Sequence, residues 1–195
     1  MTRGATDRER AKAGRHAAIL REASRLFAER GFSGVSLEDL GSAVGVSGPA
    51  LYRHFANKQA LLGALLVGVS ERLRDGGRQV SSIDGDPTSR LRALIEFHVD
   101  FALADPDVIR VQDRDLASLR DEDLRTVRRL QREYVENWIE VLADLHPHRD
   151  ADDLRVRAHA CFGLMNSTPR TARGRAGGDD ARAILETMAL AALAR

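Results

Sequence analysis

The chain has 195 residues, of which 43% are hydrophobic and 30% are charged, and its 30 basic and 29 acidic side chains leave a formal net charge of +1. This composition is typical of a globular protein with enough apolar material for one or two cores, and it excludes a disordered chain. The longest apolar stretch, from Leu61 to Val69, is far shorter than the ~20 residues that cross a bilayer. No apolar secretory segment opens the sequence. We therefore expect a cytoplasmic protein without a membrane contact.

Charge is distributed unevenly along the chain. Residues 1–60 carry ten basic and six acidic side chains, a net charge of +4, whereas residues 61–195 carry 20 and 23, a net charge of −3. This asymmetry is typical of a polyanion-binding region attached to a neutral or acidic body. The single Cys161 excludes an internal disulfide framework and a cysteine-rich metal module, and we expect it to be a small buried side chain.

Apolar residues recur at helical spacing throughout, and alternation at period two is nowhere sustained, so the sequence predicts an all-α fold. In the first third we expect a helix with an apolar stripe from Ile19 to Phe27 that ends at Gly31. Two short helices over 37–44 and 48–54 follow, capped by Ser36 and Ser47. A longer helix follows Asn57 and is expected to end near Arg74 and Gly76.

The stretch from Asp75 to Pro87 is rich in Gly, Ser and Asp and is a plausible boundary between the first third and the rest. Further helices are expected over 88–103, after Pro106, and over 121–145, 151–166 and 180–194, with a flexible link over 167–178. We divide the chain into an N-terminal arm and domain over 1–60, with its core at about 15–60, and a second region over 61–195 that begins with a connecting helix.

The two short helices joined by Gly45 match the spacing of a helix-turn-helix, whose turn needs a residue that tolerates positive φ. The second helix would then lie in the major groove of DNA. Small side chains at its start allow close approach, while Tyr52, Arg53 and His54 offer hydrogen-bond donors. Lys58, in the first turn of the next helix, can bind a phosphate. On spacing alone, an ordinary pair of helices with a glycine turn is an equal alternative.

The stretches GVSLEDL from Gly34, VGVS from Val44, LYRHF from Leu51 and NKQALL from Asn57 resemble the N-terminal DNA-binding domain of TetR-type transcriptional regulators. The resemblance is dense from Ala18 to Leu62. It implies a helix-turn-helix bundle followed by a helical ligand-binding domain, with about nine helices in all. It further implies a homodimer formed through the last two helices, a palindromic double-stranded DNA operator, and a small-molecule effector that releases the protein.

Carried over by position, the resemblance assigns roles to eight residues. Ser36 would cap the second helix and contact phosphate, Ser47 would begin the recognition helix, Tyr52 and His54 would contact the DNA backbone, and Lys58 would bind phosphate. The sequence-reading positions are Gly48, Pro49 and Arg53; Pro49 replaces a more usual polar residue and favours apolar contact with a thymine methyl group. The stretch from Arg3 to Arg15 is either an arm along the DNA or a solvated tail.

The effector site is expected among polar and aromatic residues on the apolar helical stripes of the second half. The residues are His98, Phe101, Gln112, Tyr134, Trp138, Phe162, Met165 and Asn166. For the aromatic residues and Met165 ordinary core packing is the alternative, and for His98 it is a satisfied core histidine. Arg114 is a further possible anchor, although it belongs to a charged run typical of a solvated face. The apolar character of the set favours a hydrophobic ligand.

Two other function classes remain as alternatives: an all-helical adaptor module that has lost DNA binding, and a helical enzyme acting on an apolar substrate. The retained Tyr52, His54 and Lys58 argue against the adaptor, and the lack of a nucleophile–base pattern or phosphate loop argues against the enzyme. His146 and His148 flank a proline in a polar stretch and form no fixed ligand set. We therefore expect no metal, no cofactor and no catalytic residues.

Overall fold

The structure, a computed structural model, describes residues 3–46, 51–167 and 178–195. Within these ranges every regular element is helical, which confirms the all-α prediction. The α-helices are α1 (Arg3–Arg30), α2 (Leu37–Ala43), α4 (Lys58–Ser81), α5 (Pro87–Ala104), α6 (Pro106–Asp115), α7 (Asp121–Leu145), α8 (Ala151–Ser167) and α9 (Gly178–Leu193). The expected third helix over 48–54 falls partly on 47–50, outside the described residues, as does most of the link over 167–178.

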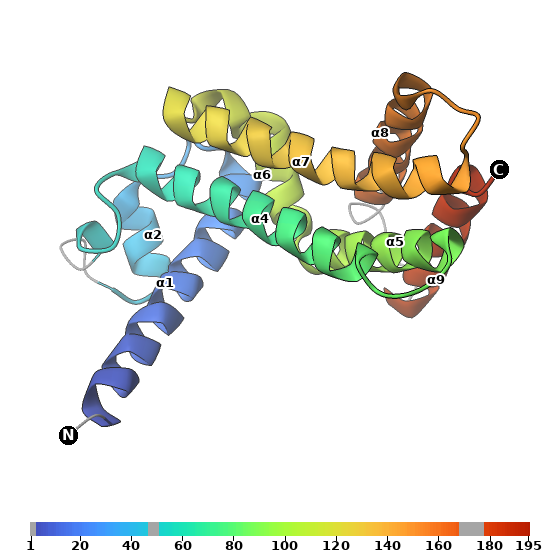
Figure 1. Ribbon diagram of the computed structural model, residues 1–195. Coiled ribbons are helices and arrows are strands. Elements are labelled where there is room, and N and C mark those ends of the chain that lie inside the picture. Colours follow the sequence, from blue (N-terminus) through green and yellow to red (C-terminus); the bar gives the residue numbers. More distant parts are fainter. Residues whose placement is uncertain (1–2, 47–50, 168–177) are drawn as a thin grey trace.

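The long helices α4 and α7 lie side by side and connect the two ends of the molecule (Figure 1). Helices α1 and α2 lie at one end and α5, α8 and α9 at the other, with α6 between the two ends. The first hydrophobic core joins α1, α2 and the start of α4 to Val108 and Val111 of α6 and Val127 of α7. The second core joins α5 and the rest of α7 to α8 and α9. Helix α6 therefore packs into the core of the N-terminal end.

The caps and turns of the N-terminal end follow the sequence. Ser36 and Asp39 form a complete capping box at the start of α2, with the Asp39 amide donating to Ser36 Oγ at 3.0 Å. Gly31, after α1, and Gly45, after α2, are the described glycines with positive φ, at 80° and 67°. Asn57 caps α4 by accepting from the Ala60 amide at 2.8 Å. These observations confirm the predicted helix boundaries around the turn.

Two predictions about helix ends were wrong. Helix α4 does not end near Gly76 but continues to Ser81. The glycines there serve packing rather than termination, since a Cβ at Gly77 would lie 2.5 Å from Cε2 of Tyr134, and a Cβ at Gly76 would clash with the ring of Phe97. At the other end, α1 begins at Arg3, so residues 3–15 form helix and not a solvated tail, whereas the contact of this stretch with DNA stays a prediction. Alanines recur in this stretch and favour helix.

None of the described helices combines the length and the apolar character needed to cross a bilayer. In the same part of the chain, no group of three or more His, Cys, Asp or Glu side chains is arranged to hold a metal ion. Cys161 is buried, as the sequence predicts.

Candidate DNA interface and effector cavity

The segment over 51–55, which follows the turn of the helix-turn-helix, is packed onto the core by two buried side chains. Leu51 is fully buried and Phe55 is 5% exposed, and the amides of His54 and Phe55 both donate to the carbonyl oxygen of Leu51, at 2.9 and 3.0 Å. Tyr52, by contrast, is 52% exposed and Arg53 is also exposed. The described part of the expected recognition helix therefore turns its tyrosine and arginine to solvent. Ser47, Gly48 and Pro49 lie outside the described residues.

Lys58 has partners inside the protein. Its ammonium donates to the carbonyl oxygens of Phe32 at 2.7 Å and Val35 at 2.8 Å, and it lies 4.5 Å from the centroid of the Phe32 ring. These contacts fasten the connection between α1 and α2 to the start of α4. An ammonium has three N–H groups, so one remains for an external acceptor. The hydroxyl of Ser36 is likewise engaged, because it donates to Asp39 Oδ2 at 2.8 Å.

A basic cluster lies where α1 meets this segment, formed by Lys12, Arg15, His16, Arg53 and His54. The ring of His16 stacks on Phe55 at 4.8 Å between centroids and lies 6.4 Å from the ring of His54. Partial burial lowers the pKa of His54, and the positive charges of the other four residues lower it further. Lys12 and Arg15 were predicted only as part of the possible DNA arm over 3–15, and His16 was not predicted, since the sequence pattern does not show that this face of α1 lies beside His54.

An aromatic cavity of about 270 Å³ lies between α4, α5, α6, α7 and α8. Six of the predicted effector residues line it: His98, Phe101, Gln112, Tyr134, Phe162 and Asn166. Five lining residues were not predicted: Leu73, Ile109, Gln131, Val135 and His159. Gln131 lies three residues before Tyr134, on the same face of the helix, so helical periodicity could have predicted it. Val135 directly follows Tyr134 and has no such signal. Trp138 and Met165 are not in the lining; both are fully buried in the second core.

His98 is the polar centre of this cavity. Its Nδ1 lies 3.1 Å from the hydroxyl of Tyr134 and its Nε2 lies 3.1 Å from Oδ1 of Asn166. An amide oxygen only accepts, so Nε2 donates to Asn166 and Nδ1 accepts from Tyr134. Complete burial lowers the pKa of His98 to about 4, and burial raises the pKa of Tyr134. His98 is thus both a satisfied core histidine and a cavity residue, so the two interpretations hold together.

Arg114 does not line the cavity, so its prediction as a cavity anchor was wrong, whereas its exposed side chain agrees with a charged, solvated run. Its guanidinium donates to the carbonyl oxygens of Phe27 and, at 3.4 Å, Ala28, near the C-terminal end of α1. It also pairs with the carboxylate of Asp115 at 2.9 Å. Arg114 lies two residues beyond Gln112, which lines the cavity, so α6 contacts the cavity with one part and the end of α1 with another.

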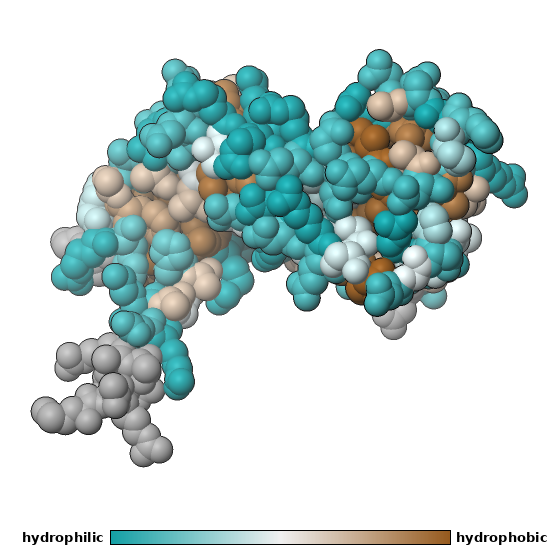
Figure 2. All heavy atoms as spheres, viewed as in Figure 1, coloured by the Kyte–Doolittle hydropathy of each residue, from teal (hydrophilic) through white to brown (hydrophobic). Residues whose placement is uncertain are grey.

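The last two helices expose large apolar side chains. Val156 on α8 is 68% exposed, and Ile184 and Met188 on α9 are 54% and 48% exposed. Figure 2 shows a mostly hydrophilic face with apolar residues gathered over the N-terminal end and over the end that holds α8 and α9. Exposed apolar surface of this kind is typical of a contact between proteins.

Comparison with known proteins agrees with this geometry. Residues 19–65 match the family model described as "Bacterial regulatory proteins, tetR family", and residues 84–193, more than half of the chain, match "Tetracyclin repressor-like, C-terminal domain". The chain belongs to the TetR family. TetR-family proteins are transcriptional regulators and not enzymes, so this chain is a DNA-binding transcriptional regulator, and the predicted family and function class are confirmed.

Individual TetR-family relatives match different lengths of the chain. The activator FasR of Mycolicibacterium smegmatis is 36% identical over 87 residues, which cover 45% of this chain and 40% of FasR. The repressor KstR2 of Rhodococcus jostii is 28% identical over 143 residues, covering 73% of this chain and 70% of KstR2. The chain thus spans less than half of FasR in that match.

Solved structures share the fold over nearly the whole chain. PfmR of Thermus thermophilus superposes with a TM-score of 0.77 at 24% identity, covering 91% of this chain and 99% of PfmR. The structure of AibR in complex with isovaleryl coenzyme A and operator DNA superposes with a TM-score of 0.73 at 22% identity, covering 89% and 97%. At these identities the likeness establishes the TetR fold.

Proposed function

We propose that this regulator binds a palindromic operator as a homodimer, most simply as a repressor, and that a small hydrophobic molecule in the aromatic cavity releases it. The observation that carries the proposal is the surface at the N-terminal end, where the exposed Tyr52 lies next in sequence to the exposed Arg53 of the basic cluster. Anchored from below by Leu51 and Phe55, this segment can enter a major groove without losing its own packing. Such a protein works in the cytoplasm, with its operator.

The proposed division of labour follows the chain. Residues 1–60 hold DNA, with Arg53, Gly48 and Pro49 toward the bases and Tyr52, His54 and the remaining N–H of Lys58 toward phosphates. Ser47 begins the recognition helix, and Ser36 acts through its cap on α2, since its hydroxyl already donates to Asp39. Residues 61–195 connect, bind the effector and dimerise. The exposed apolar side chains of α8 and α9 support a four-helix contact between two copies. Two basic ends then meet two half-sites about one helical turn, ~34 Å, or somewhat more apart.

The cavity supports a small, largely apolar effector with a few hydrogen-bonding groups. Phe101, Phe162 and Val135 provide apolar walls, while Gln112 and Gln131 provide amide groups. A ligand changes DNA affinity only if it binds two conformations unequally. Helix α6 offers the route, because Ile109 and Gln112 line the cavity and Arg114 holds the end of α1. Displacement of α6 would therefore move the helix that carries Lys12, Arg15 and His16.

The proposal is tested by mobility shift with duplexes tiled across the DNA upstream of the gene. We expect one duplex to bind in a two-protomer complex. Arg53→Ala should weaken binding to this duplex and reduce the factor by which the protein prefers it to duplexes of altered sequence. Tyr52→Ala should weaken binding to all duplexes alike. Arg149→Ala is the matched control, because Arg149 is an exposed arginine at the opposite end of the molecule, paired with Asp153 at 3.2 Å. If Arg149→Ala reduced the affinity for DNA as much as Arg53→Ala, the result would contradict the proposed DNA-binding surface.

A further inference from the structure

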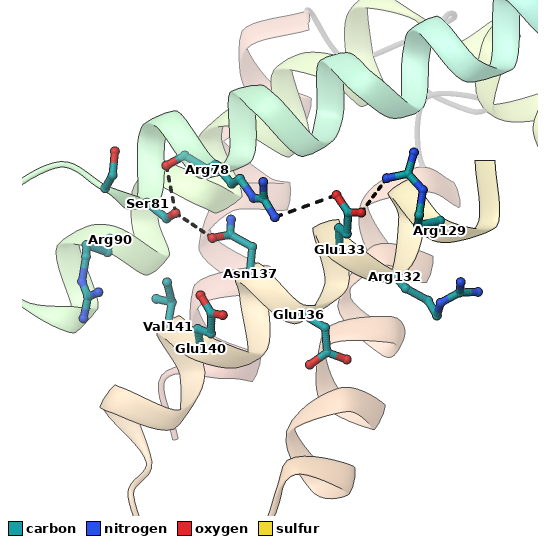
Figure 3. A pocket seen from close by; sticks show the side chains of 11 residues that line it. Arg78, Ser81, Arg90, Arg129, Arg132, Glu133, Glu136, Asn137, Glu140 and Val141 are labelled. Carbon is teal, nitrogen blue, oxygen red and sulfur yellow. Dashed lines mark hydrogen bonds and ion pairs between the residues drawn. The ribbon is translucent and has the colours of Figure 1, made fainter. Parts of the chain in front are cut away.

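A second hollow, the arginine groove, lies on a different face of α7 from the aromatic cavity. It has a volume of about 680 Å³ and is formed by the end of α4, the start of α5 and the middle of α7 (Figure 3). The α7 residues of the groove include Glu133, Asn137 and Glu140, at a spacing of four and three, whereas the cavity uses Gln131 and Val135. Helical geometry places these two sets on separate faces.

Two buried nitrogen donors in the groove have no acceptor. They are Nδ2 of Asn137 and Nε of Arg90. Asn137 is only 8% exposed, and its Oδ1 lies 2.8 Å from the hydroxyl of Ser81, which is also 3.2 Å from the carbonyl oxygen of Arg78. Buried donors are nearly always paired, because a donor without an acceptor loses the hydrogen bond that it makes to water in the unfolded chain. A pair of orphaned donors in one hollow indicates that an acceptor-bearing group belongs there.

The charges of the groove favour an anion. Four arginines and three glutamates line it: Arg78, Arg90, Arg129, Arg132, Glu133, Glu136 and Glu140. Glu133 is already neutralised by Arg129 at 2.7 Å and Arg74 at 3.2 Å, and Glu136 by Arg155 at 2.8 Å. Arg129 belongs to the groove, whereas Arg74 and Arg155 lie outside it and also pair with Asp75 and Asp152. Arg90 pairs with Asp144 at 2.6 Å, so the groove's excess of one basic side chain falls to Arg78 and Arg132.

Of the groove arginines, Arg78 is the one best placed to bind an anion. Its guanidinium is 3.8 Å from Glu133, too long for a hydrogen bond, and 59% of its side chain is exposed. Figure 3 shows it extending from α4 toward the amide of Asn137 on α7, while Arg132 points away. A guanidinium and an amide that converge from two helices form a fork suited to a planar or tetrahedral oxyanion.

We propose that the arginine groove is a second small-molecule site, which binds a metabolite bearing a phosphate or carboxylate group between Arg78 and Asn137. The occupant bridges the C-terminal part of α4 to α7. Because α4 begins at Lys58 in the DNA-binding end, a bridge at its other end fixes the helix that connects the two parts.

Calorimetric titration of the full, DNA-free chain tests this site independently of operator binding. The probes are ADP, inorganic phosphate and citrate, each at a constant ionic strength set with sodium chloride. We expect at least one to bind with a dissociation constant below 1 mM, in the ordinary range for metabolite sites. ADP or phosphate binding identifies a phosphate ligand, and citrate alone identifies a carboxylate ligand; either result supports the site.

Arg78→Gln should lower the affinity for the anion at least tenfold. Asn137→Asp, which keeps the shape of the amide but replaces the donor by a carboxylate oxygen, should do the same. Arg78 is exposed enough for its variant to fold even if the buried Asn137→Asp does not. Arg128→Gln is the control, because Arg128 is an exposed arginine of α7 outside the groove, and it should alter affinity less than twofold. No binding of any of the three anions, or equal losses in Arg78→Gln and Arg128→Gln, overturns the proposal.

Discussion

Two histidines, one at each end of the molecule, have lowered pKa values in surroundings that differ. His54 lies at the N-terminal end, partly exposed, where partial burial and the charges of His16, Arg15, Lys12 and Arg53 disfavour a further proton. His98 lies in the cavity, where complete burial is the cause and both ring nitrogens have partners. A polyanion would reverse part of the first effect and leave the second unchanged.

Under the proposed function, the difference lies in how the polar groups at each site are arranged before a ligand binds. The basic cluster gathers like charges, an arrangement that is unfavourable in the free protein and is relieved by phosphates. The cavity satisfies its central polar groups internally, so Tyr134, His98 and Asn166 form a chain that needs no ligand. An effector therefore has to compete with an existing network, or use Gln112 and Gln131 beside it.

Acid should destabilise the cavity end most strongly. His98 is neutral in the folded protein because its pKa is about 4, but an unfolded histidine takes a proton below its ordinary pKa of about 6.5. Stability that is complete above pH 6.5 is therefore lost as the pH falls toward 4, by on the order of 3 kcal/mol in all and about 2 kcal/mol by pH 5. Urea unfolding, followed by the fluorescence of Trp138, measures it.

The control separates His98 from other titrating groups. In His98→Gln, the free energy of unfolding should decline much less between pH 6.5 and 5. In His148→Gln, which changes an exposed histidine, it should decline as in the unchanged protein. An unchanged decline in His98→Gln would show that the acid sensitivity has another source.

Removing the contact that connects the two ends should also cost stability. Arg114→Gln loses the charged hydrogen bonds to Phe27 and Ala28 and leaves Asp115, which is 7% exposed, without its cation. We expect a loss of about 2 kcal/mol, moderated because Arg114 itself is partly exposed. Thermal unfolding measures the loss, with Arg110→Gln on the same helix as the control. Equal stability of the two variants would remove Arg114 from the proposed route.

Two glycines of α4 should respond to alanine with opposite signs. Gly77→Ala places a methyl group 2.5 Å from the Tyr134 ring and should destabilise the protein by ~1–3 kcal/mol, disturbing the partner of His98. Gly68→Ala meets no atom within 4 Å and should stabilise the helix by up to ~1 kcal/mol. Chemical denaturation of both variants gives the comparison. Two stabilised proteins would mean that α4 and α7 are not tightly packed at Gly77.

The smallest effect is expected at the N-terminal end, where DNA should draw a proton onto His54. Phosphates offset the charges that lower its pKa, so operator affinity should rise several-fold as the pH falls from 7 to 6. Fluorescence anisotropy with a labelled operator measures this slope. His54→Gln should flatten it and His148→Gln should not. An equal slope in all three proteins would place the linked proton elsewhere.

The sequence predicted the N-terminal end well because its determinants are local. The Ser36 cap, which Asp39 completes three residues later, and the positive φ of Gly45 depend on residues within a few positions of one another, and the predicted cap and turn glycine were both confirmed. Longer-range features were missed. The continuation of α4 through Gly77 depends on Tyr134, so a local pattern of glycines misassigned the end of this helix. The contact of Arg114 with Phe27 joins two distant parts of the chain, and the local pattern of charges does not show it.

The cavity was predicted in part for the same reason. Helical stripes identified His98 and Tyr134 as inward residues, but the stripe does not distinguish a lining residue from a core residue, so Trp138 and Met165 were included wrongly. Lys58 shows the opposite limit: its motif position indicated phosphate, while its contacts with Phe32 and Val35 appear only when the chain is folded.

The salt dependence of operator binding tests the central claim most directly. Anisotropy titrations with the upstream operator and with a scrambled duplex, at 50 to 200 mM salt, give the slope of log affinity against log salt. A dimer that places two basic ends on phosphates should lose about 10³-fold or more in affinity over this range and prefer the operator at least 10³-fold at every salt concentration. Equal binding to both duplexes, or affinity that does not change with salt, would contradict the account.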